Sequence, residues 1–235
     1  LFMRLLSWNC NNGINKKEQV EYFQSFNCDV AVLPELKEHN IEVLQPSSSI
    51  WITNNHSRSK PKGLGVLCFN GFQLEELPRD EDMEIYIPVK IKGKGIEFNL
   101  LAIWNFYWAC KQGRFKDVKG DDCLEWSALR HYKSILYDPC IVMGDFNFGP
   151  TFSQEAFVYM NGVFEDMGIK GLYHQFNNLP WTETKHFTYK SPMQTFHHLD
   201  HIFGSEYFQK RMKSFTVGKL EDAVLSDHSP LVLDI

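Results

Sequence analysis

The 235-residue sequence contains no apolar run of the about 18–20 residues that a membrane-spanning helix requires. It contains no internal repeat, no low-complexity segment and no long linker. Its first residues lead directly into a strand-like segment, Met3 to Trp8, without the charged and then apolar pattern of a secretory signal. These absences predict a globular chain with no membrane partner.

Paired or zinc-spaced cysteines are also missing. The six cysteines are scattered, with no CxxC pair and no Cys/His zinc spacing. Cys28, Cys68 and Cys140 lie inside or beside apolar runs, where a free cysteine behaves as a small hydrophobic residue. We therefore expect reduced, structural thiols in a cytoplasmic protein.

The sequence lacks the excess of positive charge that a general nucleic-acid-coating protein carries, because its net charge is −5. Binding to nucleic acid would then require a local basic patch. One cluster runs from Lys111 through Arg114 to Lys119 and follows an aromatic run that extends from Trp104 to Trp108. A second cluster is Arg58, Lys60 and Lys62. Each cluster is equally consistent with solvated loop lysines.

What the sequence does contain is enough apolar surface for a core, with 43% hydrophobic and 14% aromatic residues. Short β-branched and aromatic runs bounded by Gly, Pro or Asn alternate with helical patterns along the chain. The predicted strands are Arg4–Asn9, Asp29–Pro34, Ile50–Thr53, Leu64–Phe69, Ile85–Ile91, Phe98–Trp104, Cys140–Gly144, His198–Gly204, Phe215–Val217 and Pro230–Ile235. The predicted helices are Lys16–Phe26, Asp122–Leu136 and Gln154–Met167. The pattern predicts one α/β domain over residues 1–235, with two packed sheets and helices outside.

Polar residues gather where the predicted strands end or begin, at five places far apart in the sequence. The segments are Trp8-Asn9 with Asn11, Pro34-Glu35, Gly144-Asp145-Phe146-Asn147, Leu199-Asp200-His201-Ile202 and Ser226-Asp227-His228. In layered α/β folds, loops at strand ends are held by the rigid sheet and are where sites assemble. Five such segments indicate a single convergent cluster.

These five segments, in this order, resemble the endonuclease/exonuclease/phosphatase superfamily, which includes pancreatic-type deoxyribonucleases and apurinic endonucleases. The resemblance extends over nearly the whole chain and is strongest to compact bacterial members of unassigned substrate, to which the Lys62-Gly63-Leu64-Gly65-Val66 segment is also similar. It implies a four-layer α/β/β/α sandwich and a metal-dependent phosphoric ester hydrolase.

Hydrolysis of a phosphate ester at neutral pH requires a hard cation on the phosphoryl oxygens and an aligned water. Mg²⁺ prefers carboxylate and other oxygen ligands. Glu35 is the principal predicted metal ligand, and the resemblance implies the same. We expect Asp227 to contribute directly or through water, with neutral oxygens from Asn9 and Asn11. The expected cofactor is Mg²⁺, with Mn²⁺ as the alternative.

The predicted catalytic residues are Asp145, Asn147, Asp200 and His228. His228 is suited to acid–base or phosphate-contact work because its unperturbed pKa is near neutrality, and the resemblance pairs it with Asp200. Asp145 would orient or deprotonate the water, or protonate the leaving group. Asn147 can donate its amide to a nonbridging oxygen.

The remaining predicted substrate contacts are Asn9, Trp104, Asn105, His198, Lys111 and Arg114. Many relatives carry His or Tyr after the central strand, where this chain has Trp104 and Asn105; Trp cannot transfer a proton. Alternation would place His198 on the face of Asp200, where it either contacts a phosphate or is structural, and would send His201 to the other face as a structural residue.

The predicted function is a nuclease acting on DNA or RNA. One alternative is a phosphatase or phosphodiesterase for a small molecule or a lipid head group, which suits the acidic net charge. Another is a catalytically silent binding domain, against which the intact set of polar residues argues. The expected partner is accordingly nucleic acid or a phosphorylated small molecule.

Overall fold

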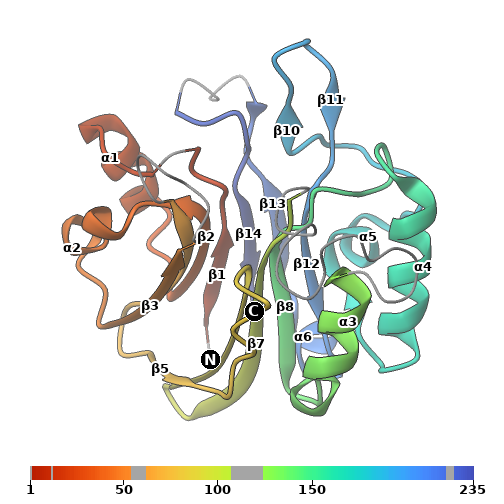
Figure 1. Ribbon diagram of the computed structural model, residues 1–235, viewed down its shortest axis with the longest axis horizontal. Coiled ribbons are helices and arrows are strands. Elements are labelled where there is room, and N and C mark those ends of the chain that lie inside the picture. Colours follow the sequence, from red (N-terminus) through yellow and green to blue (C-terminus); the bar gives the residue numbers. More distant parts are fainter. Residues whose placement is uncertain (1, 12, 54–61, 107–123, 221–224) are drawn as a thin grey trace.

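Two six-stranded sheets lie face to face at the centre of the computed structural model (Figure 1). The structure describes residues 2–11, 13–53, 62–106, 124–220 and 225–235. The first sheet has the order β13(Ser214–Val217), β14(Leu231–Asp234), β1(Arg4–Ser7), β2(Val30–Leu36), β4(Gly63–Cys68), β3(Ser48–Thr53). The second has the order β5(Gln73–Glu76), β6(Tyr86–Gly93), β7(Ile96–Trp104), β8(Cys140–Asp145), β12(Asp200–Gly204), β9(Lys170–Gly171). Both are mixed sheets, since β1 with β2 and β7 with β8 pair in parallel among antiparallel neighbours.

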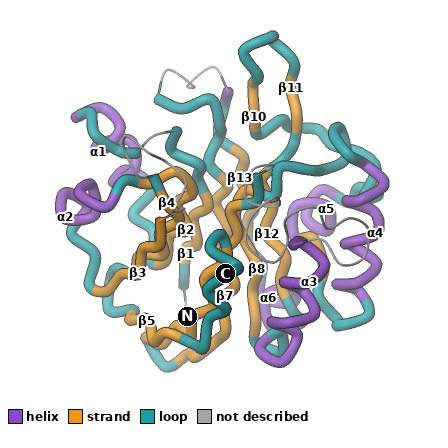
Figure 2. The backbone as a smooth tube through the Cα atoms, viewed as in Figure 1, coloured by secondary structure: helices purple, strands orange, loops and turns teal. Residues whose placement is uncertain are grey.

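Helices cover the outer face of each sheet, and a two-stranded hairpin projects beyond them (Figure 2). The hairpin is β10(Tyr189–Lys190) with β11(Phe196–His197). The α-helices are α1(Lys17–Ser25), α2(Ile41–Leu44), α3(Leu124–His131), α4(Gln154–Glu165), α5(Leu172–Asn177) and α6(Glu206–Arg211), and two 3-10 helices are η1(Glu38–Asn40) and η5(Tyr132–Ile135). Helices α1 and α2 lie on the side of the first sheet, and α3 and α4 on the side of the second (Figure 1).

Strand alternation produces the layers. In β8, Ile141 and Met143 belong to the core between the sheets, whereas Cys140 and Val142 pack toward the helices. Asp145 has the parity of Met143, so the strand delivers its carboxylate to the layer between the sheets. The predicted two-sheet α/β sandwich with flanking helices is therefore confirmed.

All ten predicted strands and two of the predicted helices, Lys16–Phe26 and Gln154–Met167, occur within a few residues of their expected bounds. The predicted helix Asp122–Leu136 is described from Leu124 and divides into α3 and the 3-10 helix η5. The strand predicted from His198 begins at Asp200, because the N–H groups of His198 and Leu199 bond to hydroxyls of Thr151 and Thr188 instead of a neighbouring strand. Short elements such as β5, β9, β10, β11, α2, α5 and α6 were not predicted. Of the cysteines, Cys10, Cys28, Cys68 and Cys140 are described, and all are buried and free. No helix in the described ranges is long and apolar enough to cross a membrane.

Candidate active site

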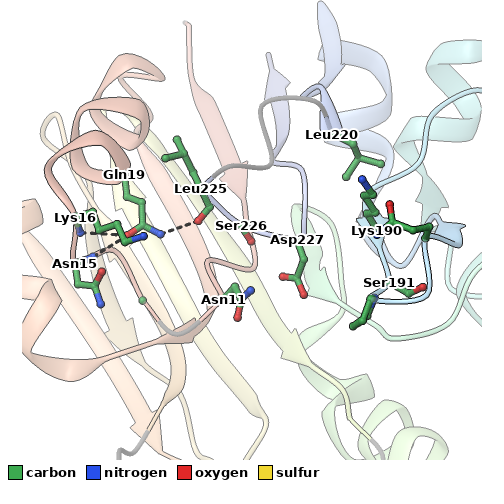
Figure 3. Close-up of a pocket in the computed structure, with 13 residues that line it drawn as sticks. Asn11, Asn15, Lys16, Gln19, Lys190, Ser191, Leu220, Leu225, Ser226 and Asp227 are labelled. Atoms are coloured by element: carbon green, nitrogen blue, oxygen red, sulfur yellow. Dashed lines mark hydrogen bonds between the residues drawn. The ribbon is translucent and has the colours of Figure 1, made fainter.

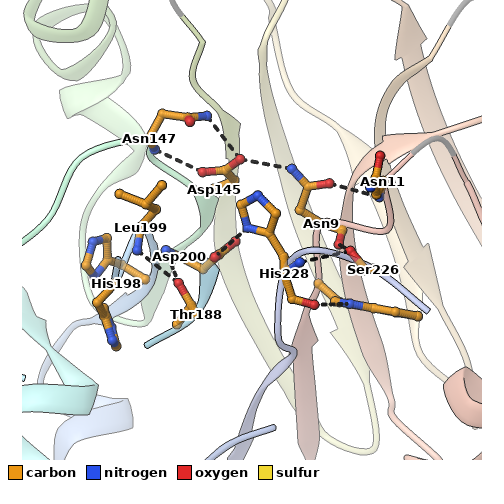
Figure 4. A network of polar contacts seen from close by, with 12 residues as sticks. Asn9, Asn11, Asp145, Asn147, Thr188, His198, Leu199, Asp200, Ser226 and His228 are labelled. Carbon is orange, nitrogen blue, oxygen red and sulfur yellow. Dashed lines mark hydrogen bonds and ion pairs between the residues drawn. The ribbon is translucent and has the colours of Figure 1, made fainter. Parts of the chain in front are cut away.

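The polar segments meet at one end of the sandwich, where strand ends of both sheets come together (Figure 4). Asn9, which follows β1 of the first sheet, donates from Nδ2 to Asp145 Oδ2 at 3.0 Å across to the second sheet. The same amide lies 3.5 Å from Glu35 Oε1. Asn9 therefore connects the acidic groups of the two sheets, and its own Oδ1 accepts the N–H of Asn11 at 3.1 Å.

Asp145 and Asp200 are cross-strand partners at the end of the second sheet. The antiparallel register of β8 and β12 pairs them directly. Asp145 follows Gly144, whose φ is +147° and where an added Cβ would lie 1.8 Å from the carbonyl oxygen of Ile103, so glycine is required there. The tight packing of β7 against β8 thus fixes where the Asp145 carboxylate emerges.

His228 is held in one orientation from both sides. Its Nδ1 lies 2.8 Å from Asp200 Oδ2, a buried pair in which His228 is 6% and Asp200 0% exposed on the side chain. The His228 carbonyl accepts the indole N–H of Trp8 at 3.0 Å, and its N–H donates to Ser226 Oγ at 3.1 Å. The ring of Tyr189 packs on the imidazole with centroids 4.7 Å apart. The arrangement leaves Nε2 as the imidazole nitrogen that is directed away from Asp200.

Burial and mutual repulsion set the charges of this cluster. The pKa of Asp145 is raised because burial penalises its carboxylate and because Asp200 adds a second negative charge nearby. Burial alone would lower the pKa of His228, but the carboxylates of Asp200 and Asp145 outweigh it and raise the pKa above the ordinary value. Burial also raises the pKa of Asp227. The two carboxylates therefore favour the protonated form of the imidazole.

Glu35 projects into the site from an irregularity in β2. The register with β4 shifts between Pro34 and Leu36, so Glu35 is the extra residue of a β-bulge, and its φ is +62°. Left-handed backbone is costly for a residue with a Cβ. The carboxylate is bound by Lys62, whose Nζ lies 2.5 Å from Oε2 and 5.7 Å from the ring centre of Trp104.

Two sets of residues at this place could hold a divalent cation. Asp145, Asp200 and His228 offer ligand atoms within 4.8 Å of one another. However, His228 Nδ1 is already bonded to Asp200, and a protonated imidazole has no lone pair for a metal. The second set is Glu35 with Asp227, two carboxylates whose charges interact and which offer oxygen donors of the kind Mg²⁺ prefers. A cation, the Lys62 ammonium, already lies against Glu35, which shows that this carboxylate is placed to receive positive charge.

Asn147 lies beside Asp145 and is fixed by it. Its backbone N–H donates to Asp145 Oδ1 at 2.9 Å, and its side-chain Nδ2 donates to Asp145 Oδ2 at 3.0 Å and to the carbonyl of Asn105. Asn105 is buried, and its own Nδ2 donates to Glu125 Oε1 at 3.3 Å. Asn105 thus positions Asn147 through its backbone, and its predicted phosphate contact stays a prediction.

Two predicted substrate contacts are corrected by the structure. His198 is fully buried, its Nδ1 lies 2.8 Å from the carbonyl of His186, and its ring packs on Tyr173 at 4.4 Å and on His201 at 5.0 Å. His198 precedes β12, so strand alternation does not place its side chain on the face of Asp200. Trp104 is 3% exposed and belongs to the core between the sheets. Lys111 and Arg114 lie outside the described residues.

Other residues of the site were not predicted from the sequence. The buried Thr188 accepts the N–H groups of Leu199 and Asp200 on Oγ1, at 2.9 and 3.1 Å. The tilted ring of Tyr189 packs on the imidazole of His228, and Lys62 binds Glu35. Thr188 and Tyr189 lie at the start of a short hairpin without sequence periodicity, so no pattern marks them. Lys62 occurs in a basic cluster and in the segment that is similar to compact bacterial members, but neither pattern predicts that it binds Glu35.

Comparison with known proteins agrees with this fold. A family model described as the endonuclease/exonuclease/phosphatase family matches residues 6–228, so the chain belongs to that family. Members of this family hydrolyse phosphoester bonds, which makes the chain a phosphoesterase of that superfamily. A search of curated proteins finds no match.

Several solved structures share the fold at low identity. The endonuclease domain of TRAS1, a telomere-specific non-LTR retrotransposon, has a TM-score of 0.68 at 16% identity, covering 100% of this chain and 98% of that one. An AP endonuclease from Leishmania major has a TM-score of 0.69 at 12% identity, covering 100% and 87%. A 3′ phosphatase from Neisseria bound to a product DNA hairpin has a TM-score of 0.63 at 17% identity, covering 98% of each chain.

Proposed function

We propose that this protein hydrolyses phosphodiester bonds of nucleic acid with the help of a divalent cation. The observation that carries the proposal is the buried His228–Asp200 pair, which lies beside Asp145 at the point where Asn9 links Asp145 to Glu35. The similar structures are a retrotransposon endonuclease, an AP endonuclease and a 3′ phosphatase bound to a DNA hairpin, which supports nucleic acid as the substrate class.

Asp145 is the group that orients the attacking water. Its two oxygens are held by Asn9 Nδ2 and by the backbone and side-chain N–H groups of Asn147, so its direction is fixed before substrate binds. Its raised pKa brings a buried carboxyl closer to the range in which a group exchanges protons with water. Asp145 thus serves as the acid–base group. Both N–H groups of Asn147 Nδ2 are already donated, to Asp145 Oδ2 and to the carbonyl of Asn105, so Asn147 donates to a phosphoryl oxygen only after it releases one of these bonds.

His228 contacts the phosphate through Nε2. Asp200 holds the opposite nitrogen, so the imidazolium N–H at Nε2 is aimed and charged. A charged donor in a buried site favours the extra negative charge that develops on the phosphoryl oxygens during attack. Asp200 is in this scheme a positioning residue that acts through His228.

Glu35 and Asp227 would hold the divalent cation, with Asn9 and Asn11 as neutral neighbours. When bound, such a cation neutralises charge on the phosphoryl oxygens and lowers the cost of forming the nucleophile. The donor set consists of oxygen atoms, which favours Mg²⁺ and also accepts Mn²⁺. Lys62 has to leave Glu35 Oε2 for a cation to bind there.

The test is a panel of substrates incubated with Mg²⁺, Mn²⁺ or a chelator. The panel contains plasmid, abasic-site duplex, single-stranded DNA, RNA, bis(p-nitrophenyl) phosphate and p-nitrophenyl phosphate. The proposal predicts cation-dependent cleavage of at least one nucleic acid and of the diester. Cleavage of monoesters alone would favour the small-molecule phosphatase, and no cleavage of any substrate would favour a silent binding domain.

A further inference from the structure

A polar pocket of about 720 Å³ opens directly beside the site (Figure 3). Its volume is in the range of about 300–1,000 Å³ that is typical of small-molecule and nucleotide sites. The lining is mainly polar and comes from the segment before α1, the end of the β10–β11 hairpin and the loop that carries Asp227. None of the catalytic side chains described above forms this lining, so the pocket lies next to the reacting groups and does not coincide with them.

The floor of the pocket is continuous with the site. Asn11, Ser226 and Asp227 line it, and Ser226 Oγ donates to the carbonyl of Asn9 at 2.7 Å while accepting the N–H of His228. Asp227 accepts the N–H of Lys190 on its carbonyl at 2.9 Å. A ligand in the pocket would therefore rest on the same loop that positions His228 and the proposed metal ligand.

The two walls carry one lysine each. Lys16 stands just before α1 and Lys190 at the end of β10, on opposite sides of Asp227 (Figure 3). Within the described residues neither ammonium forms an ion pair, and Lys190 lies 5.8 Å from the ring centre of Phe196. The wall beneath Lys16 is braced by Gln19, which donates to the carbonyl of Leu225 at 2.7 Å and accepts the N–H groups of residues 15 and 16. The lysines thus stand on backbone that is already fixed.

The charges around the pocket determine which class of ligand it can bind. The chain carries a net charge of −5. Glu35 and Asp145 of the adjacent site and Asp227 on the pocket floor contribute to it, and these carboxylates repel an anionic strand. One divalent cation at Glu35 neutralises the reacting phosphate only. A polynucleotide carries a further negative charge on every nucleotide, and nearby positive charge has to neutralise it. Lys16 and Lys190, on opposite walls of the pocket, supply positive charge for the phosphate next to the reacting one.

We propose that this pocket binds the phosphate next to the scissile one, with Lys16 and Lys190 as its counter-charges, and that it selects polynucleotide strands over isolated phosphate esters. The inference rests on the proposed function, since it assigns the substrate of the same site. The shared chemistry is the sugar–phosphate backbone, which DNA and RNA both offer. The carboxamides of Asn15 and Gln194 also line the pocket and would contact sugar or base groups of the strand.

The test compares two substrates and two double variants. Single strands of about ten nucleotides, as DNA and as RNA of one sequence, match the span of a typical single-strand site; bis(p-nitrophenyl) phosphate has no second phosphate. The test variant is Lys16→Met/Lys190→Met. The control, Lys17→Met/Lys210→Met, removes the same charge from α1 and α6, where the two side chains are 82% and 67% exposed and do not line the pocket.

We expect the pocket variant to lose at least about tenfold more kcat/KM on the better oligonucleotide than on the small diester, mainly through KM, because it removes two charge-assisted contacts that the small diester does not make. The slope of log kcat/KM against log salt should become less negative by about 0.7 for each strand phosphate contact that is lost. The control should keep the wild-type ratio of the two substrates.

Two results would overturn the inference while the proposed function stands. The first is equal loss on both substrates by the pocket variant, and the second is wild-type hydrolysis of the small diester with no preference for a strand. Failure of the wild-type protein to hydrolyse either substrate with Mg²⁺ or Mn²⁺ would instead contradict the proposed function itself. A difference between the DNA and the RNA strand identifies the preferred sugar. The role of the lysines is decided by the ratio of the kcat/KM losses on the oligonucleotide and on the small diester.

Discussion

The bond between His228 Nδ1 and Asp200 Oδ2 makes these two side chains a single functional unit. Each substitution, His228→Ala or Asp200→Ala, is expected to lower kcat/KM by about 10² or more, the scale of a lost acid–base group. Because Asp200 acts only through the imidazole, the double variant should be little worse than the poorer single variant. A double-mutant cycle at saturating Mg²⁺ measures this, and losses that multiply independently would show that the pair is not coupled.

Glu35 combines a functional carboxylate with an unfavourable backbone angle, φ +62°. Glu35→Gln and Glu35→Gly both remove the anionic ligand, so both should bind Mg²⁺ more weakly in calorimetry and lose most cation-dependent activity. Gly tolerates this φ at no steric cost, so Glu35→Gly should be more stable to urea than Glu35→Gln by about 1 kcal/mol. Unchanged Mg²⁺ affinity in both variants would remove Glu35 from the metal site.

Thr188 fixes the start of β12 and thereby the direction of Asp200. Its Oγ1 accepts two buried N–H groups, and its carbonyl accepts the N–H of Ser229 at 2.7 Å. Thr188→Val leaves both N–H groups unsatisfied and should cost about 2–4 kcal/mol of unfolding free energy, with a loss of kcat/KM as Asp200 shifts. Thr188→Ser keeps the hydroxyl and serves as the control. Equal activity of the two variants would show that β12 needs no such anchor.

Buried neutral histidines tie the segment before β10 to its surroundings. His174 Nε2 of α5 lies 3.2 Å from the carbonyl of Glu183, and His198 Nδ1 lies 2.8 Å from that of His186. Burial lowers the pKa of His174 to about 4 and that of His198 to about 3. The second sheet therefore depends on imidazoles that must stay uncharged in the folded state.

The sign of the resulting pH dependence follows from proton binding. The unfolded chain binds these protons near pH 6.5 and the folded chain does not, so stability is complete above about 6.5 and falls as pH drops toward 4. Each histidine contributes a loss on the order of 1 kcal/mol per pH unit in that window. Urea unfolding between pH 7 and 5 should give a shallower slope for His174→Gln than for the wild type. The exposed His131→Gln is the matched control, and equal slopes for all three would contradict the account.

Much of the whole molecule could be predicted because its patterns are local. Apolar strands bounded by turn residues marked all ten predicted strands, and polar residues at their ends marked Glu35, Asp145, Asp200 and His228. These side chains meet because the two sheets bring their strand ends together, which only the three-dimensional packing decides. The bulge at Glu35 and the pairing of Asp145 with Asp200 follow from register, and register is not visible in one strand alone.

The residues that were misplaced or missed lie where tertiary contacts replace local pattern. The sequence pattern extends β12 back to His198. In the structure the hydroxyls of Thr151 and Thr188 accept the N–H groups of His198 and Leu199, so the strand begins at Asp200. Trp104 has the sequence position of a site residue, yet strand parity buries it between the sheets. Lys16 and Lys190 are 174 residues apart in the sequence (190 − 16). They come together only in the folded protein, where both line the pocket.

We propose that the cluster at the junction of the two sheets hydrolyses phosphodiester bonds with Asp145 as its acid–base group. Cleavage of a single-stranded oligonucleotide during a Mg²⁺ titration tests this role in the wild type and in Asp145→Asn. Cleavage should require Mg²⁺ in the wild type and should fall by about 10²–10⁴ in the variant, with the melting temperature of the variant close to that of the wild type. Cleavage by Asp145→Asn at the wild-type rate, or wild-type cleavage that persists unchanged in a chelator, would contradict this role of Asp145 and of the cation.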